Sequence, residues 1–419
     1  MLKITIGEPN WIYKTNGTVR DIAISQTGDY IFLASYDGYV YFLDTNGNLL
    51  WNYKVGKGAR DVAISAQGNV CIASSEEGYV YIFDKNGKTL VEHKAGAVVR
   101  DVAISSDGKY AIAGSDDKYI YFFDRNKKLW DYKTNGWVGR VAISQNGEYA
   151  IAGSTDDNIY FFNNSGKLLW KYKTRSWLES VTLTQDGSYA VGGSDDRTVY
   201  SFNKEGKLLW QYETINPILC IRMSANAELI AVGVECEAYV FNKAGKLLWQ
   251  RVIGFEIPEL KPSFSGELVV IGSRSGWVDV FDKFGKVLWR YNTGCWVESV
   301  DTTSNGNFVV AGLQDGRALF FDTTKIVLKK LESVRIKIDW LKDSMKISDS
   351  DLAKLESLLN NAKEYTLANY YTEASQNIAE SESLLAKLGR IEISVCSACG
   401  RKIEKDWIVC PFCGRSLRY

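Results

Sequence analysis

The sequence is poor in the features on which many enzymes and membrane proteins depend. Its 419 residues include one histidine and five prolines. It has no run of about 18 uncharged apolar residues, so we expect no membrane-spanning helix. The opening MLKITIGEPNW lacks the long apolar stretch of a secretory signal. Basic and acidic residues number 50 each, which argues against a large surface for nucleic acid or membranes.

Catalytic groupings are also missing. His93 is the single histidine, so a Ser-His-Asp arrangement has no second candidate, and no GxxxxGK[ST] loop is present to hold phosphate. We expect His93 to be a packing residue. Acidic pairs such as Asp116/Asp117 recur along the chain, and their place in turns explains them better than a calcium site does. The sequence therefore predicts a protein that is not an enzyme.

What the sequence does have is a repeat of about 40 residues that occurs eight times. Each copy contains four runs rich in Val, Ile, Tyr, Phe and Trp, separated by Gly, Asp, Asn and Ser, which is the signature of strands and tight turns. Four strands per repeat at a constant spacing predict the blades of a mainly β fold, a β-propeller. The spacing is clearest in the intact aromatic pairs that mark the outer strands: Trp11/Tyr13, Trp51/Tyr53, Trp130/Tyr132, Trp170/Tyr172, Trp210/Tyr212 and Trp289/Tyr291.

Two local features of the repeats carry expectations of their own. Residues 119–123 are apolar at every position, so both faces of that strand are expected to be covered. Gly108 and its counterparts stand where a tight turn needs a positive φ. The sixth repeat has Ala227 at this position, and we expect a different turn type there.

The ring is expected to have eight blades within residues 1–324 and to be closed by the beginning of the chain. The first outer strand precedes any inner strand, and the last repeat has no outer strand after it. Residues about 8–14 are therefore expected to complete the final blade. Seven blades is the alternative, because Pro258 and Pro262 stand where the inner strand of the seventh repeat should lie.

A helical segment and a cysteine motif follow the ring. In residues 325–390 apolar residues fall three or four apart, which predicts an α-helical hairpin or small bundle. This segment is either a spacer or a coil for dimerisation or partner docking. Residues 391–419 contain two C-x-x-C-G sequences, whose four thiolates match tetrahedral Zn²⁺. The predicted ligands of one structural zinc ion are Cys396, Cys399, Cys410 and Cys413.

The cysteines also allow other interpretations. Redox dithiols and an iron–sulfur centre are the alternatives to zinc at the two C-x-x-C-G sequences. Four further cysteines are scattered through the repeats among apolar neighbours, and we expect them to be free thiols in a reducing cytoplasm. They are Cys71, Cys220, Cys236 and Cys295.

The last segment resembles the zinc-ribbon family over residues of about 394–416, because both C-x-x-C-G knuckles are present. Such ribbons dock protein or nucleic acid, so the resemblance implies a docking module. A small excess of basic residues makes Arg401, Lys402 and Lys405 the candidates for contact with nucleic acid. A nucleic-acid- or ribosome-associated factor that binds through the ribbon is therefore the alternative function.

The repeats themselves, with their GSDD, YFF and GKLLW runs, resemble the tryptophan-containing propeller repeats named after pyrroloquinoline quinone enzymes. Their inner strands also resemble WD repeats. Similar blades form outer-membrane assembly scaffolds, which bind partners. The quinone cofactor is not expected here, because the enzymes that use it are exported and this chain lacks an export signal. An enzyme that uses a small molecule in the propeller channel is a further alternative.

One mouth of the predicted ring carries uneven charge. Arg20, Arg60 and Arg100 occupy the same position of three consecutive inner strands, whereas the fifth and eighth repeats have Glu179 and Glu298 there. Tryptophan and arginine are over-represented in the energetic centres of protein interfaces. We predict a partner-binding face from these arginines and nearby tryptophans; the alternative is that the arginines pair with Asp21, Asp61 or Asp101 of a neighbouring blade. The tryptophans are Trp137, Trp177, Trp296 and Trp277.

These observations favour a cytoplasmic, non-enzymatic interaction scaffold. The propeller face and the zinc ribbon are its expected docking surfaces, and its expected partners are proteins.

Overall fold

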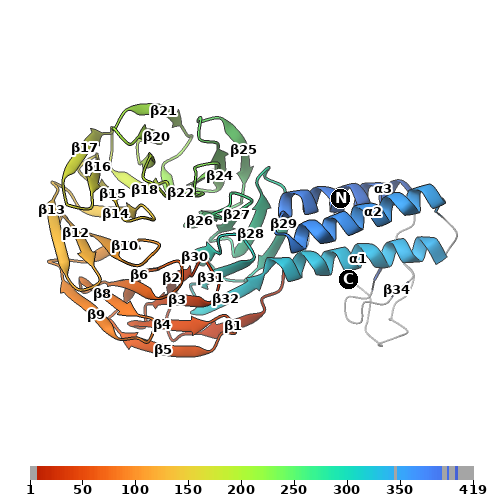
Figure 1. The fold of residues 1–419 in the computed structure, drawn as a ribbon, viewed down its shortest axis with the longest axis horizontal. Helices are drawn as coiled ribbons and strands as arrows, with labels where there is room; N and C mark the ends of the chain where they lie inside the picture. Colours follow the sequence, from red (N-terminus) through yellow and green to blue (C-terminus); the bar gives the residue numbers. More distant parts are fainter. Residues whose placement is uncertain (1–6, 344–346, 389–393, 396–401, 404–419) are drawn as a thin grey trace. The chain divides into compact units, whose positions relative to one another are not determined.

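The computed structural model describes residues 7–343, 347–388, 394–395 and 402–403. In this part of the chain, eight four-stranded antiparallel sheets surround a common centre (Figure 1). We call them blades 1–8 in chain order. The strands of blades 1–4, from the centre outward, are β2 (Val19–Ile24), β3 (Tyr30–Ser35), β4 (Tyr39–Asp44), β5 (Leu49–Lys54); β6 (Ala59–Ile64), β7 (Val70–Ser75), β8 (Tyr79–Asp84), β9 (Thr89–Lys94); β10 (Val99–Ile104), β11 (Tyr110–Ser115), β12 (Tyr119–Asp124), β13 (Lys128–Lys133); β14 (Val138–Ile143), β15 (Tyr149–Ser154), β16 (Asn158–Asn163) and β17 (Leu168–Lys173).

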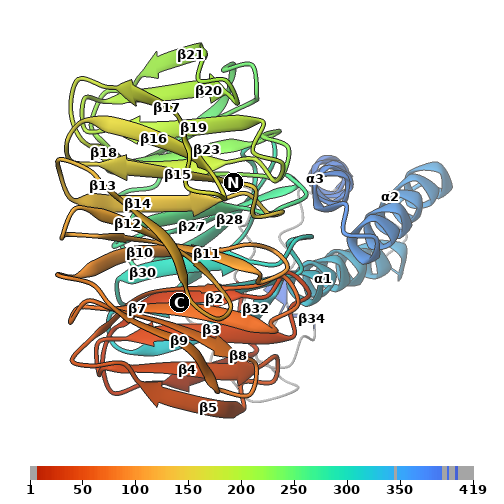
Figure 2. The same ribbon diagram turned by 60° about the vertical axis from the view of Figure 1, so that its left-hand side comes forward.

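Blades 5–8 continue the same order. Their strands are β18 (Leu178–Leu183), β19 (Tyr189–Ser194), β20 (Thr198–Asn203), β21 (Leu208–Glu213); β22 (Ile218–Met223), β23 (Ile230–Val234), β24 (Glu237–Phe241), β25 (Leu247–Val252); β26 (Glu259–Pro262), β27 (Leu268–Gly272), β28 (Trp277–Asp282), β29 (Val287–Asn292); and β30 (Val297–Thr302), β31 (Phe308–Leu313), β32 (Arg317–Asp322) with β1 (Trp11–Lys14). Consecutive blades lie face to face, as the turned view shows for β11, β15 and β19 (Figure 2).

The aromatic pairs of the sequence hold each blade to the next. Trp130 on β13 lies opposite Phe122 on β12, and their rings stack with centroids 4.8 Å apart. The indole Nε1 of Trp130 donates a hydrogen bond to the carbonyl oxygen of Asn164 in blade 4, at 3.0 Å. Residues 120–123 of β12 are buried on both faces, as the apolar run predicted. The repeat spacing thus reflects a contact that recurs between neighbouring blades.

The prediction of a different turn at Ala227 is wrong. Ala227 has a φ of 59°, and its N–H donates to the carbonyl oxygen of Ser224 at 3.0 Å. The counterpart Gly108 has a φ of 68° and makes the same bond to Ser105 at 2.9 Å. The shared hydrogen bond keeps the turn type, and the Ala227 methyl packs into the core cluster around Tyr189. Tertiary packing therefore outweighs the local preference for glycine.

Blade 7 is a complete sheet, which excludes the seven-bladed alternative. Its inner strand β26 has four residues and pairs with β27 from Glu259 opposite Gly272 to Pro262 opposite Val269. Pro258 precedes the strand and Pro262 ends it, so neither proline interrupts the middle of the ladder.

The chain's beginning closes the ring, as predicted. β1 pairs with β32 over four residues, from Trp11 opposite Phe320 to Lys14 opposite Arg317. On the channel side, the Oδ2 atom of Asp301 in blade 8 accepts the N–H of Ile24 in blade 1 at 3.0 Å. The two ends of the array are therefore joined both at the rim and at the centre.

Three helices follow: α1 (Thr323–Asp343), α2 (Asp349–Leu367) and α3 (Tyr371–Leu388), then the short paired strands β33 (Ser394–Val395) and β34 (Lys402–Ile403). The chain divides into two compact units, residues 4–326 and residues 1–3 with 327–419. In the second unit α2 packs against α3, and Ser348 caps α2 by accepting the N–H of Asp351 at 3.2 Å. None of the helices in the described ranges is long and apolar enough to cross a bilayer.

Candidate functional site

The inner strands of the ring enclose a central cavity of about 750 Å³. We call the face that holds the loops before each inner strand, such as residues 134–137 and 174–177, the upper face. These loops meet the second-to-third strand turns of the same blades: the N–H of Thr155 donates to the carbonyl oxygen of Trp137, and that of Asp195 to the carbonyl oxygen of Trp177. The residues that line the cavity include arginines and tryptophans near this face, charged side chains of the inner strands, and apolar side chains such as Ala63 and Ala103.

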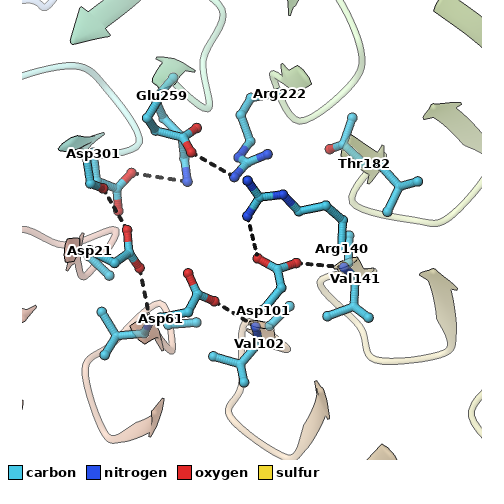
Figure 3. A pocket seen from close by; sticks show the side chains of 18 of the residues that line it. Asp21, Asp61, Asp101, Val102, Arg140, Val141, Thr182, Arg222, Glu259 and Asp301 are labelled. Atoms are coloured by element: carbon cyan, nitrogen blue, oxygen red, sulfur yellow. Dashed lines mark hydrogen bonds and ion pairs between the residues drawn. The ribbon is translucent and has the colours of Figure 1, made fainter. Parts of the chain in front are cut away.

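A layer of carboxylates joins the inner strands of neighbouring blades (Figure 3). Asp21, Asp61 and Asp101 stand at the same position of β2, β6 and β10. Each accepts a backbone N–H from the next blade: Val62 at 3.0 Å, Val102 at 2.7 Å and Val141 at 2.6 Å. These residues therefore act as blade-to-blade links, a role that the sequence reasoning did not assign to them.

Three cations in the same layer pair with carboxylates. Arg140 and Arg222 extend into the centre of the ring (Figure 3). The shortest N–O distances are 3.4 Å for Arg140 with Asp101, 3.0 Å for Arg222 with Glu259 and 3.2 Å for Lys261 with Asp301. Each of these carboxylates is thereby compensated.

Asp21 and Asp61 lack a cation partner among the described residues. Asp21 accepts a hydrogen bond from the Ser299 hydroxyl at 2.6 Å, and the Asp61 carboxyl accepts one from the N–H of Val102. Burial raises the pKa of the Asp61 carboxyl well above its usual value, and the nearby Asp101 and Asp21 carboxylates raise it further. The part of the cavity wall formed by blades 1 and 2 therefore contains two carboxyl groups without a cation partner among the described residues.

The three predicted arginines line the upper part of this cavity. Arg20 pairs with Glu298 of blade 8 at 3.0 Å, and Arg100 makes two hydrogen bonds to Asp116. Arg60 has its nearest carboxylate, Glu76, at 3.7 Å. The alternative that these arginines pair with Asp21, Asp61 or Asp101 is wrong, because those aspartates are turned toward the backbone of the next blade.

The four predicted tryptophans do not form one cluster. Trp137 and Trp177 line the cavity and are 51% and 44% exposed. Trp296 is 42% exposed and lies against the guanidinium of Arg274, whose Cζ is 5.3 Å from its ring centre. Trp277 begins β28 and packs under Arg290 at 4.1 Å, outside the cavity wall. Of the four, Trp137 and Trp177 therefore line the cavity, whereas Trp296 and Trp277 do not.

Sequence reasoning missed other exposed apolar side chains of the upper face. Tyr36, Ile215 and Phe255 lie in the loops and turns of blades 1, 6 and 7. Their positions could have indicated this, because they lie in inter-strand segments at the same end of their blades as the segments that hold the tryptophans. With Trp137 and Trp177 they leave large apolar side chains facing solvent on one side of the ring, which is characteristic of interaction surfaces.

The remaining candidates of the ring have structural roles. His93 packs edge-on against Tyr121 with ring centres 4.9 Å apart, and burial lowers the pKa of its imidazole. In the acidic pair of blade 3, Asp117 accepts hydrogen bonds from the N–H groups of Tyr119 and Gly96 and from the hydroxyl of Tyr121. The described ranges contain no group of three or more His, Cys, Asp or Glu side chains arranged for a metal ion.

The predicted ribbon sites fall elsewhere. Cys396, Cys399, Cys410 and Cys413, with Arg401 and Lys405, lie outside the described residues. Lys402 belongs to β34, whose backbone pairs with Val395 of β33.

The comparisons with known proteins concern the ring. Residues 116–256 match the family model described as outer membrane protein assembly factor BamB, and residues 7–115 match a family of unknown function. No curated protein matches the sequence significantly. The repeats at 116–256 are thus similar to those of BamB.

Solved structures share the fold. Sqt1 of Chaetomium thermophilum, in a structure bound to the N-terminus of ribosomal protein L10, is 15% identical over 75% of this chain and 100% of its own, with a TM-score of 0.67. Sqt1 of Saccharomyces cerevisiae is 15% identical over 76% and 99%, with a TM-score of 0.66. The designed protein Ika8 is 17% identical over 76% and 99%, with a TM-score of 0.64. The chain is an eight-bladed β-propeller with BamB-like repeats, followed by three helices.

Proposed function

We propose that this chain is a non-enzymatic interaction scaffold that binds a protein partner on the upper face of its ring. The observation that carries the proposal is the pair Trp137 and Trp177, both about half exposed at the rim of a cavity of about 750 Å³. A buried tryptophan contributes more to the free energy of binding than most side chains, and exposed ones beside a cavity are suited to such burial.

The similar proteins give this proposal some support. Sqt1 was solved with the N-terminus of a ribosomal protein bound, and BamB is an assembly factor. The free thiols Cys71 and Cys220 are buried in the ring, which suits a cytoplasmic protein in a reducing environment. The partner that we propose is therefore a cytoplasmic protein.

Replacing both Trp137 and Trp177 by alanine is expected to weaken partner binding by at least about 30-fold, because the loss of even one energetically important interface tryptophan costs about 2 kcal/mol or more. The free energy of unfolding should change little, since about half of each side chain is exposed. Affinity purification from the native cell and thermal unfolding measure the two effects.

Leu169→Ala with Leu209→Ala is the matched control, because these leucines are comparably exposed on the outer strands β17 and β21. Equal partner recovery by the tryptophan variant and the wild type would contradict the proposed face. A large drop in melting temperature would instead assign the tryptophans a structural role.

We also propose that residues 391–419 form a zinc ribbon that acts as a second docking point. The donor set of four cysteine thiolates fits tetrahedral zinc and leaves no ligand position open for catalysis. The backbone pairing of β33 with β34, on either side of Cys396 and Cys399, supports a hairpin at the first knuckle. Zinc there would hold together a segment with few apolar side chains.

The full chain is expected to contain one zinc ion, and Cys396→Ser with Cys399→Ser is expected to lose it. Structural zinc sites contribute about 10–16 kcal/mol of apparent binding free energy at neutral pH, so the wild-type ion should survive gel filtration. Metal analysis by mass spectrometry measures the content. Cys236→Ser, a free thiol of the ring, is the control and should keep the ion. Iron in place of zinc, or no metal at all, would refute the assignment.

A further inference from the structure

The guanidinium of Arg60 is the least compensated cation of the cavity mouth. Its side chain is 19% exposed, and it donates no hydrogen bond to any described residue. Its nearest carboxylate oxygen, on Glu76, is 3.7 Å away and belongs to a side chain that is 42% exposed. A guanidinium has five N–H donors, and those of Arg60 remain accessible to solvent, because none of its nitrogens is among the buried side-chain atoms without a hydrogen-bond partner in the described ranges. Arg60 therefore has binding capacity that the ring itself does not use.

The flanking arginines are different. Arg20 is bonded to Glu298 at 3.0 Å, and Arg100 is bonded to Asp116 through two of its nitrogens. Burial lowers the pKa of the Arg60 guanidinium, and the nearby Arg100 and Arg20 lower it further. Arg60 is thus flanked by two arginines and has no close partner of its own, which favours an anionic group from outside.

Apolar contact area lies in the same cavity wall, on the loops that enter blades 4 and 5. Trp137 stacks with Arg100, whose Cζ is 5.6 Å from the ring centre, and Trp177 follows on the next blade. Glu179 lines the wall beyond the tryptophans, and Arg274 of blade 7, which also lines it, is paired with Glu256 at 2.7 Å. A ligand that fits this mouth has a negative group on one side and apolar groups on the other.

We propose that Arg60 recognises a carboxylate of a protein segment that lies across the upper mouth, with apolar residues of that segment on Trp137 and Trp177. The carboxylate belongs to an aspartate or glutamate side chain or to a chain end. A carboxylate fits the guanidinium fork with two parallel hydrogen bonds. This inference rests on the proposed function and adds the chemistry of the partner.

A protein carboxylate suits the site better than a nucleic acid does. Asp21, which has no cation partner among the described residues, lines the same cavity below the arginines and disfavours a polyanion. Nucleic-acid binding commonly neutralises about 6–10 phosphates, whereas this mouth has one arginine without a close counter-ion. A single carboxylate flanked by apolar side chains matches both the charge and the tryptophans.

The test uses random-sequence peptides displayed on phage and selected on the full-length chain. Enriched peptides should carry an aspartate or glutamate next to aromatic or aliphatic residues. Arg60→Gln is expected to weaken such a peptide by about 10–100-fold, the range for hydrogen bonds to a charged group. Arg197→Gln is the matched control: Arg197 is an exposed arginine of the upper face that pairs with Glu213.

A double-mutant cycle then identifies the pairing. Changing the acidic residue of a selected peptide to its amide should weaken binding to the wild-type protein as much as Arg60→Gln weakens binding of the unchanged peptide. On the Arg60→Gln variant, the same peptide change should weaken binding only slightly further. Equal losses on both proteins would overturn the pairing, as would enriched peptides without acidic residues or preferential binding of single-stranded DNA. If these peptides still need Trp137 and Trp177, the docking face stands without Arg60; if no peptide binds, both proposals fail.

Discussion

Removing residues 1–14 is expected to unfold the ring at temperatures at which the full chain remains folded. The deletion takes away β1, which supplies the outer strand of blade 8. Trp11 stacks on Phe320 with ring centres 5.2 Å apart, and its Nε1 donates to the carbonyl oxygen of Thr45 in blade 1 at 2.8 Å. Loss of one large aromatic side chain from a packed site costs about 3–5 kcal/mol, and the ladder is lost with it. The total free energy of unfolding of a typical domain is only about 5–15 kcal/mol.

Near-ultraviolet circular dichroism during heating measures the loss, and hydrogen exchange locates it. Exchange should rise first at the amides of β32, which loses its partner strand. A synthetic peptide of residues 7–14, added in excess, should restore protection there because it can occupy the vacant edge. If β32 keeps its full protection in the deleted chain, the closure by β1 contributes little and the expectation fails.

The number and spacing of the blades could be predicted because the repeat records one contact many times. Trp51 makes the contacts that Trp130 makes, at the equivalent positions of its own blade. It stacks on Phe42, and its Nε1 donates to the carbonyl oxygen of Lys85 in the next blade at 3.0 Å, as Trp130 donates to that of Asn164. A constant period therefore survives the degraded repeat in which Val91 replaces the tryptophan. Where tertiary contacts decide a single position, as at Ala227, local preference gave the wrong turn.

The partners of the mouth arginines could not be predicted. Arg20 and Glu298 are 278 residues apart, and they meet because the ring closes blade 8 against blade 1. Asp21 follows Arg20 directly in the same strand, but its carboxylate accepts a hydrogen bond from the N–H of Val62 in the next blade. Charge pairing across a closed ring depends on side-chain direction, which the repeat pattern does not encode.

The tryptophans illustrate the same limit within the candidate site. Trp277 and Trp296 both lie near the upper end of their strands, and the sequence predicted both as partner-binding residues. The structure separates both from Trp137 and Trp177: Trp277 lies against Arg290 and Trp296 against Arg274, and neither lines the cavity. Exposure beside the cavity, which needs coordinates, is what distinguishes an interaction residue from a structural one.

Trp289→Ala is expected to lower the free energy of unfolding by about 3–5 kcal/mol, the largest effect of any single outer-strand tryptophan, because its side chain is fully buried. Its ring packs on Phe321 with centres 5.0 Å apart, and a Cβ on Gly7 would lie 2.7 Å from it. The N-terminal segment therefore covers this tryptophan before it enters blade 8. Chemical denaturation followed by fluorescence measures the loss.

The same substitution at Trp51 is the matched comparison. Trp51 occupies the equivalent position of blade 1 but is only partly buried, so its loss should cost less than that of Trp289. Trp289→Phe should recover most of the stability, because the indole N–H of Trp289 is buried without an acceptor among the described residues and no hydrogen bond is forfeited. Trp51→Phe gives up the bond to Lys85. Equal costs for alanine at the two positions would contradict this account, because they would show that cover by the N-terminal segment adds nothing to the recurring blade contact.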